Sequence, residues 1–198
     1  MNFSEVRNRY AAGESPCDVI AGIYQKIIAW NDPAMFLHLP GEEELLGIAR
    51  QVEALPRELP LWGIPFVVKD NIDVAGWPTT AACPDFSYVP DADAEVVRLL
   101  REAGAIPIAK ANLDQFATGL VGTRSPFGIC RSVFNPEYIS GGSSSGSAGI
   151  PGAAGGSRPT RRKRVRAIAT THAGTVRSPA SRSRIPCRIS ASPGRPVS

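Results

Sequence analysis

With 198 residues and 43% apolar side chains, the chain is long enough for one globular domain or for part of a larger one. No run of eighteen apolar residues occurs, which argues against a transmembrane helix, and the first ten residues lack the apolar stretch of a secretory signal. The four cysteines are widely spaced and form no CxxC pair, so we expect no metal site, no disulfide framework and a reducing, cytoplasmic setting.

The net charge of +4 averages two unlike parts of the chain. Residues 1–148 hold eleven basic and eighteen acidic residues, whereas residues 149–198 hold eleven basic residues, no acid and no Phe, Trp or Tyr. The second part is rich in Arg, Ser, Pro, Ala and Gly, a composition that buries too little apolar area to balance the entropy of ordering. We therefore predict a folded part over residues 1–148 and a disordered basic tail over residues 149–198.

The beginning of the chain has the pattern of three helices and one short strand. After a short helix over residues 2–12, Ser15 is placed to cap a second helix with Pro16 at its first position. Apolar side chains recur at helical spacing along this second helix, so one of its faces should be buried. Residues 35–39 then predict a short buried strand, and residues 41–54 predict a third, amphipathic helix.

The middle of the chain has the pattern of a strand–helix–strand unit. The apolar run Ile64–Val68 and the run Ala105–Ala109 are typical of strands buried on both faces. Between them residues 91–103 predict a helix, with Asp93 as its cap and Gly104 at its end. Its apolar stripe is formed by Val96, Val97, Leu99 and Leu100. A right-handed crossover of this kind indicates an α/β sheet.

Two stretches carry the residues suited to chemistry. Lys69 directly follows the first buried strand, where an amine costs free energy unless it is paired or functional; the alternative is that it extends to solvent. The segment Ile139–Ala148, ISGGSSSGSA, suits a tightly folded backbone that offers N–H and O–H groups at close range; the alternative is a flexible linker. Because lysine and serine together can activate a hydroxyl nucleophile, we expect Lys69 to lie close to this loop.

The order of four motifs resembles the amidase signature family. The motifs are KDN at 69–71, AGAI at 103–106, AKANLDQFA at 109–117 and GGSSSGS at 141–147. The resemblance covers roughly residues 15–148, and the sequence FATGLVGTRSP at 116–126 is similar to the allophanate hydrolases within that family. It implies an α/β class and an incomplete amidase-signature fold, with a mixed sheet flanked by helices.

The resemblance also implies a triad of a serine nucleophile, a second serine whose peptide bond is cis, and a lysine. By motif position Lys69 is the lysine and Ser143 is the cis-serine. Other residues of the loop are implied to support it, the serines by hydrogen bonds: Gly141, Gly142, Ser144, Ser145 and Ser147. Three residues are implied to bind substrate: Ala117, Thr118 and Gly119. A lysine accepts a proton only if its pKa falls, which burial at a strand end favours.

The chain departs from the family pattern after Ala148. The family continues with a small-residue helix and a GTDTAGS-like motif that holds the nucleophile and the oxyanion-hole N–H groups. That nucleophile is expected around Ala167, where this chain has no serine. The segment ATTHAGTVRSPA at 169–180 is a weak echo of the motif and puts Thr175 at the position of the nucleophile. We interpret the change as a truncated family domain with an apparent shift of reading frame, and expect this chain to be inactive.

These observations predict an amidohydrolase resembling allophanate hydrolase, which converts allophanate to ammonia and carbon dioxide. One alternative is another amidase of the family or an amidotransferase A subunit. A second alternative is a non-catalytic remnant with a basic, nucleic-acid-binding tail, although that tail has no aromatic side chain for base stacking. We expect a small-molecule amide substrate, no cofactor, no membrane association and, for full-length family members, a homodimer.

Overall fold

A three-stranded mixed sheet organises the computed structural model, which describes residues 3–133 and 135–148. Its strands are β1 (Phe36–His38), β2 (Pro65–Lys69) and β3 (Ile106–Ala111), in the order β1-β3-β2. Strand β3 pairs parallel with β2 and antiparallel with β1. The parallel pair confirms the predicted strand–helix–strand unit, and it places the ends of β2 and β3 side by side.

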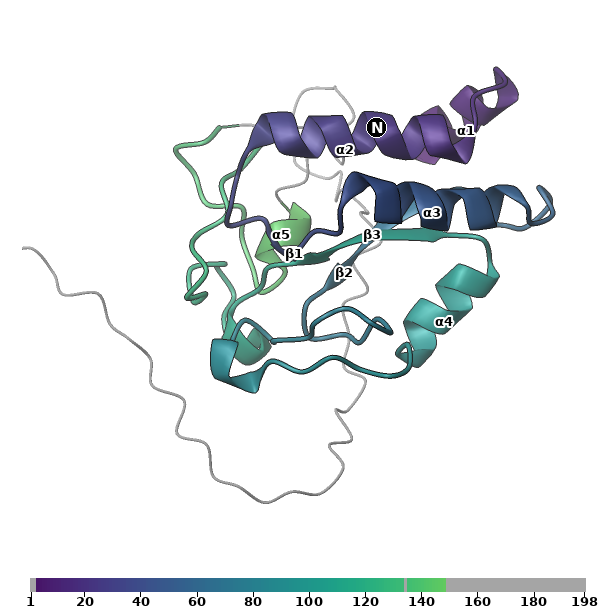
Figure 1. Ribbon diagram of the computed structural model, residues 1–198. Helices are drawn as coiled ribbons and strands as arrows, with labels where there is room; N and C mark the ends of the chain where they lie inside the picture. Colours follow the sequence, from purple (N-terminus) through teal and green to yellow (C-terminus); the bar gives the residue numbers. More distant parts are fainter. Residues whose placement is uncertain (1–2, 134, 149–198) are drawn as a thin grey trace, which may run out of the picture.

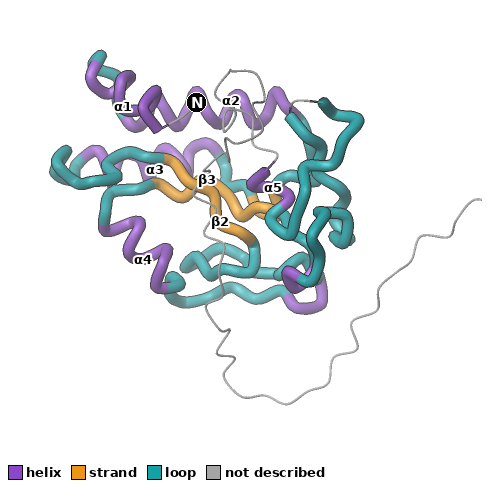
Figure 2. The backbone as a smooth tube through the Cα atoms, turned by 180° about the vertical axis from the view of Figure 1, so that it is seen from behind, coloured by secondary structure: helices purple, strands orange, loops and turns teal. Residues whose placement is uncertain are grey.

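Helices cover the sheet on both sides. Figure 1 shows α3 (Glu42–Glu53) above strand β3 and α4 (Glu95–Glu102) below it. Helix α2 (Pro16–Trp30) packs against α3 as an outer layer, and α1 (Phe3–Ala11) contacts α2. Three short helical turns complete the described elements: η1 (Pro84–Phe86), η2 (Gln115–Ala117) and α5 (Ser145–Ala148). Figure 2 shows long loops gathered around α5, on the side of the molecule away from α4.

The predicted cap of the second helix is present at the start of α2. The Ser15 hydroxyl accepts a hydrogen bond from the Asp18 N–H at 3.1 Å, and the Asp18 carboxylate accepts one from the Ser15 N–H at 2.9 Å. This reciprocal capping box satisfies two backbone donors that the helix itself leaves unpaired. At the other end Asn31 adopts a left-handed conformation with φ of 49°, which ends the helix.

The main apolar core lies between the helices and the sheet. Ile20 of α2 and Leu45 of α3 are fully buried on one side of the sheet, and Val97 of α4 is fully buried on the other. Val68 and Ile106 of the two parallel strands belong to the same cluster. Each such side chain contributes about 1.5–3 kcal/mol when it is removed from water. The core thereby holds the strand ends at fixed positions.

The predicted cap of α4 is wrong. The helix begins at Glu95, with Ala94 at the N-cap position and no side-chain hydrogen bond to the helix end. The Asp93 carboxylate instead accepts a hydrogen bond from the Ala75 N–H at 2.8 Å and lies 3.3 Å from the Arg101 guanidinium. It therefore ties the preceding loop to the helix, and it cannot also bind the first turn.

The predicted apolar stripe of α4 is only partly buried. Val97 is buried and Val96 and Leu100 pack partly against the core, whereas Leu99 is 50% exposed. At about 100° per residue, Leu99 lies roughly 160° around the helix from Val97, so the two side chains cannot face the core together.

Gly104 ends the turn after α4, as predicted. It has φ of +90°, and a Cβ there would come within 3.0 Å of the Trp62 backbone. Its carbonyl accepts a hydrogen bond from the Gly63 N–H at 2.9 Å. Only glycine fits this conformation beside another backbone, and the contact aligns the starts of β2 and β3.

Candidate active site

Lys69 is the last residue of β2 and is buried at the end of the sheet. Its side chain is only 5% exposed, and its register partner on β3 is Ala111. The Lys69 Nζ lies 2.7 Å from the Ser143 Oγ, a hydrogen bond that spans 74 residues of sequence. The structure therefore brings together the two residues that the sequence singled out, and Lys69 does not simply extend to solvent.

The loop that carries Ser143 is held by backbone hydrogen bonds. The Gly142–Ser143 peptide bond is cis, and Gly141 has φ of +91°. The Ser143 carbonyl accepts a hydrogen bond from the Asp114 N–H at 2.9 Å, and the Gly142 N–H donates to the Leu120 carbonyl at 3.2 Å. These bonds tie the loop to the segment that follows β3, so Ser143 belongs to the fold and the linker alternative is wrong.

Burial sets the protonation of Lys69. Desolvation lowers the pKa of the Lys69 amine below its ordinary value of 10.5, and the negative charge of Asp114 partly opposes that fall. A lowered pKa increases the fraction of neutral amine near neutral pH. A neutral amine can accept a proton, and the Ser143 hydroxyl lies within hydrogen-bond distance of this one.

A buried ion pair that the sequence analysis missed joins Asp70, the residue after Lys69, to Lys110 of the neighbouring strand β3. Lys110 is fully buried in β3, and its Nζ lies 3.2 Å from the Asp70 carboxylate. The same ammonium donates to the Pro78 carbonyl at 2.9 Å and to the Thr79 hydroxyl at 2.8 Å. Burial lowers the pKa of Lys110 below its ordinary value, and the negative charge of Asp70 opposes part of that fall. The signal in the sequence was an acid directly after one buried strand and a lysine at the end of the next.

Asp114 is a second site residue that the sequence analysis missed. Its carboxylate is fully buried and accepts hydrogen bonds from the Gly122 N–H at 3.0 Å and the Arg124 N–H at 2.8 Å. An acid three residues beyond a buried strand could have drawn attention for the same reason as Lys69, because burying an unpaired charge is costly.

Two of the supporting serines contact the loop through their backbones. The Ser145 carbonyl accepts a hydrogen bond from the Ser140 hydroxyl at 2.9 Å, and the Ser144 carbonyl accepts one from the Ala148 N–H at 3.2 Å. The hydroxyls of Ser144 and Ser147 are buried and have no hydrogen-bond partner among the described residues, whereas the Ser145 hydroxyl forms a hydrogen bond with the Cys130 thiol. Hydrogen bonds from these hydroxyls to the loop stay a prediction.

Of the three residues with an implied substrate role, Ala117 is the last residue of η2, and Thr118 and Gly119 form the turn that follows it. Ala117 is half-buried with φ of 58°, and the Thr118 hydroxyl donates to the Gln115 carbonyl at 2.9 Å. Gly119 is buried against the Asp114 side chain. The turn leads directly into Leu120, whose carbonyl is bonded to the serine loop, so these residues border the site; their role toward substrate stays a prediction.

The remaining predictions concern the C-terminal tail, metal binding and membrane-spanning helices. Thr175 and the tail over 149–198 lie outside the described residues. Within residues 3–133 and 135–148, no group of three or more His, Cys, Asp or Glu side chains could hold a metal ion. Among the helices of that same part, none combines the length and apolar character needed to cross a membrane.

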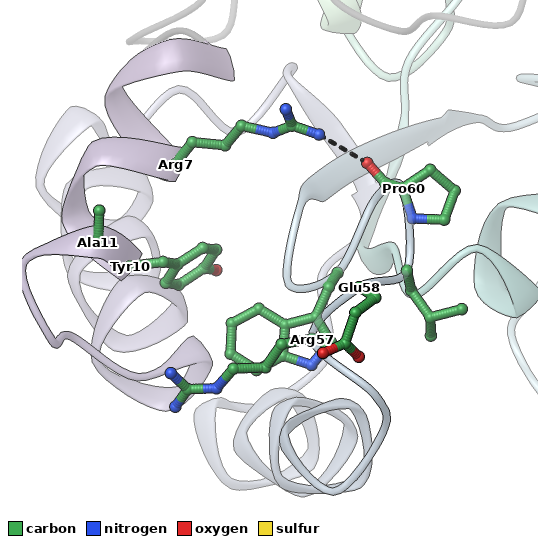
Figure 3. A pocket seen from close by; sticks show the side chains of 8 residues that line it. Arg7, Tyr10, Ala11, Arg57, Glu58 and Pro60 are labelled. Atoms are coloured by element: carbon green, nitrogen blue, oxygen red, sulfur yellow. Dashed lines mark hydrogen bonds between the residues drawn. The ribbon is translucent and has the colours of Figure 1, made fainter.

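A separate pocket of about 410 Å³ opens between α1 and the turn before β2 (Figure 3). Its lining includes Arg7, Tyr10, Arg57, Pro60 and Trp62. The Arg7 guanidinium donates to the Pro60 carbonyl at 3.0 Å, and the Arg57 guanidinium lies 5.1 Å from the centre of the Trp62 ring. No residue of the site described above lines this pocket, and its arginines are occupied by these contacts.

Two kinds of known protein are similar in sequence to this chain. The chain is 65% identical over 92 residues to the urea amidolyase of Saccharomyces cerevisiae, a match that covers 46% of this chain and 5% of that protein. It is 36% identical over 188 residues to the A subunit of the glutamyl-tRNA(Gln) amidotransferase of Symbiobacterium thermophilum, which covers 91% of this chain and 37% of that protein. The chain thus spans well under half the length of these relatives.

Among solved structures, the fold is similar to the allophanate hydrolase of Kluyveromyces lactis. The TM-score is 0.61 at 44% sequence identity, and the match covers 71% of this chain and 25% of that one. The mixed sheet flanked by helices therefore confirms the predicted fold class. The amidase family model matches residues 18–185, which includes the whole of the Lys69–Ser143 site. The chain belongs to the amidase family.

Proposed function

We propose that this protein is a C–N hydrolase of linear amides, with Lys69 as the base and Ser143 as the proton relay of its active site. The observation that carries the proposal is the 2.7 Å hydrogen bond between the buried Lys69 Nζ and the Ser143 Oγ. An amine and a hydroxyl at this distance can exchange a proton directly.

The chemistry follows from the protonation of Lys69. In its neutral form the amine accepts the Ser143 proton, and Ser143 in turn takes the proton of an attacking hydroxyl. That hydroxyl forms a bond to the amide carbonyl carbon, and the C–N bond breaks as the proton returns through Ser143 to the leaving nitrogen. Water then releases the acid and restores the hydroxyl. We assign no described residue as the nucleophile, and Thr175 stays a prediction outside them.

Allophanate is the substrate that the relatives favour, with ammonia and carbon dioxide as products. The support comes from two similar proteins, an allophanate hydrolase at 44% identity, whose name states the substrate, and a urea amidolyase at 65% identity. We further propose a cytoplasmic location, a small amide substrate and a homodimer for the complete protein. The proposed location rests on the four cysteines, which are widely spaced and form no CxxC pair.

A second candidate is an amidotransferase A subunit, which would release ammonia from an amide for use by a partner. The observation in its favour is coverage. The amidotransferase of Symbiobacterium thermophilum matches 91% of this chain through its A subunit, whereas the match to the yeast urea amidolyase covers 46%. Ammonia release from glutamine distinguishes the two candidates.

The test replaces part of a working relative. Residues 15–148 of this chain are placed in the matching segment of the Kluyveromyces lactis allophanate hydrolase, and ammonia release from allophanate and from glutamine is measured. We expect release from allophanate, and a loss of at least about 10³-fold in rate for Lys69→Ala and for Ser143→Ala. Lys26→Ala, a change at an exposed residue of α2, is the matched control and should leave the rate unchanged.

The full chain is assayed beside the chimera. We expect it to release ammonia from allophanate no faster than its own Lys69→Ala variant, because its sequence has no serine around Ala167, where the resemblance places the nucleophile. Faster release would show that a hydroxyl within residues 149–198 reaches the site, and would overturn the expectation of inactivity. A chimera that folds, by circular dichroism, but is silent toward both amides would contradict the proposed function.

A further inference from the structure

The Asp114 side chain stands where three segments of the site meet. Its two carboxylate oxygens accept hydrogen bonds from the Gly122 and Arg124 N–H groups, while its own N–H donates to the Ser143 carbonyl. Both of these side-chain hydrogen bonds come from backbone donors, and the carboxylate also acts on the Lys69 amine through its charge. Desolvating a fully buried carboxylate costs free energy, which these interactions offset in part.

Glycines enclose the Asp114 carboxylate. A Cβ added at Gly119 or at Gly142 would come within 3.0 Å of its carboxyl atoms. A Cβ at Gly122 would equally approach the Gly141 carbonyl of the serine loop. The carboxylate therefore packs directly against the backbones of two loops, at positions where only glycine leaves it room.

We propose that Asp114 is a positioning residue, which clamps the Ser143 loop against residues 119–124 and thereby holds the Ser143 hydroxyl at the Lys69 amine. It touches neither the Lys69 amine nor the Ser143 hydroxyl through a hydrogen bond of its own, so it acts through the backbone of both loops. The proposal deepens the function proposed above, because it concerns the same site. Its test reads the titration of Lys69 and the exchange of the loop, so it can fail while the amidase activity stands.

The negative charge of Asp114 has a second, measurable consequence. It favours the ammonium form of Lys69 and opposes the effect of burial on the pKa of that amine. If Asp114 loses its charge, the pKa of Lys69 falls further. A residue that only filled space would leave this pKa unchanged.

The experiment uses the full 198-residue chain with Asp114→Asn, Asp114→Glu and Asp32→Asn. Asp32 is the matched control, because its carboxylate also accepts two backbone N–H bonds, from Ala34 at 3.0 Å and from Arg131 at 3.2 Å. The chain has four lysines, Lys26, Lys69, Lys110 and Lys163, so the lysine ¹³Cε signals are few enough to titrate separately. A Lys69→Arg variant assigns the Lys69 signal.

We expect Asp114→Asn to lower the pKa of Lys69 further, and Asp32→Asn to leave it unchanged. Asp114→Glu keeps the charge and should restore most of the pKa. Hydrogen exchange of residues 141–147 should accelerate about tenfold or more in both Asp114 variants, because neither side chain fits the glycine enclosure with both hydrogen bonds intact.

Any of three results would overturn the proposal. The first is a folded Asp114→Asn protein in which Lys69 titrates as in the unmodified chain. The second is unchanged exchange over residues 141–147 in Asp114→Glu, which also decides the matter if Asp114→Asn does not fold. The third is accelerated exchange over the same residues in the Asp32→Asn control, which would refute a specific role for Asp114.

Discussion

Replacement of Lys110 by Met should lower the free energy of unfolding of this protein more than a substitution at an exposed residue does. The methionine keeps the volume of the buried stem but removes the ammonium that lies 3.2 Å from the Asp70 carboxylate. Asp70 then stays buried with its charge, although its other oxygen still accepts from the Thr80 N–H at 2.9 Å and from the Thr80 hydroxyl. The Pro78 carbonyl and the Thr79 hydroxyl lose their donor as well.

The size of the effect follows from these contacts. Breaking one side of a buried ion pair costs about 3–5 kcal/mol, and most of that cost is the uncompensated charge of the remaining partner. With a urea dependence of about 2 kcal/mol per M for a chain of this size, the midpoint of unfolding falls by about 2 M. Neutralising Asp70 in the same protein removes the uncompensated charge and should recover part of the loss.

The assay is urea unfolding of the full chain at pH 7, followed by the fluorescence of its three tryptophans. Lys110→Met, Asp70→Asn and the double variant are compared in a double-mutant cycle. A midpoint shift of less than about 0.5 M for Lys110→Met would refute the predicted cost of the lone carboxylate, and so would single losses that simply add up in the double variant.

Three further predictions use the same unfolding assay. Ser15→Ala removes one half of the capping box of α2 and should cost about 1 kcal/mol, whereas a loss below about 0.3 kcal/mol would show that Asp18 caps the helix alone. Gly47→Ala, in the interior of α3 with open space at its Cβ, should raise the free energy of unfolding by about 0.5–1 kcal/mol. Gly104→Ala should lower it, because the added Cβ would meet the Trp62 backbone. A change of the same sign in both variants would show that the space at the Cβ does not decide the effect. Because burial lowers the pKa of Lys69, the unfolded chain binds more protons than the folded chain between that lowered pKa and 10.5. The free energy of unfolding should therefore rise with pH across this window, and Lys69→Met should reduce the rise. An identical rise in both proteins would contradict the lowered pKa of Lys69.

Much of the fold could be predicted because its signals are local. The capping pair of Ser15 and Asp18 lies within one turn of helix, and the apolar run before Lys69 reports burial by itself. Asp93 shows where local signals fail. Its sequence position suits a helix cap, but its carboxylate is used by Ala75 and Arg101, which approach it only in the folded chain.

Part of the candidate site could also be predicted, because the motifs that contain its residues are local in the sequence. Motif positions pointed to Lys69 and Ser143, and the structure brings them together. The pair of Asp70 and Lys110 depends on the parallel register of β2 and β3, in which Val68 lies opposite Lys110. No pattern within either strand states that register, so the partner of each buried charge could not be read from the sequence.

The central place of β3 also constrains the order in which this chain can fold. Strand β3 must pair with β1 and β2, which lie far earlier in the sequence, before the loop after it has a surface to dock on. Arg131 then returns to Asp32, 99 residues away, and Ser143 returns to Lys69, 74 residues away. Closing such long loops costs entropy that only a formed sheet can repay, so these contacts should form late. A nascent chain would therefore hold its helices and strands well before it holds a site.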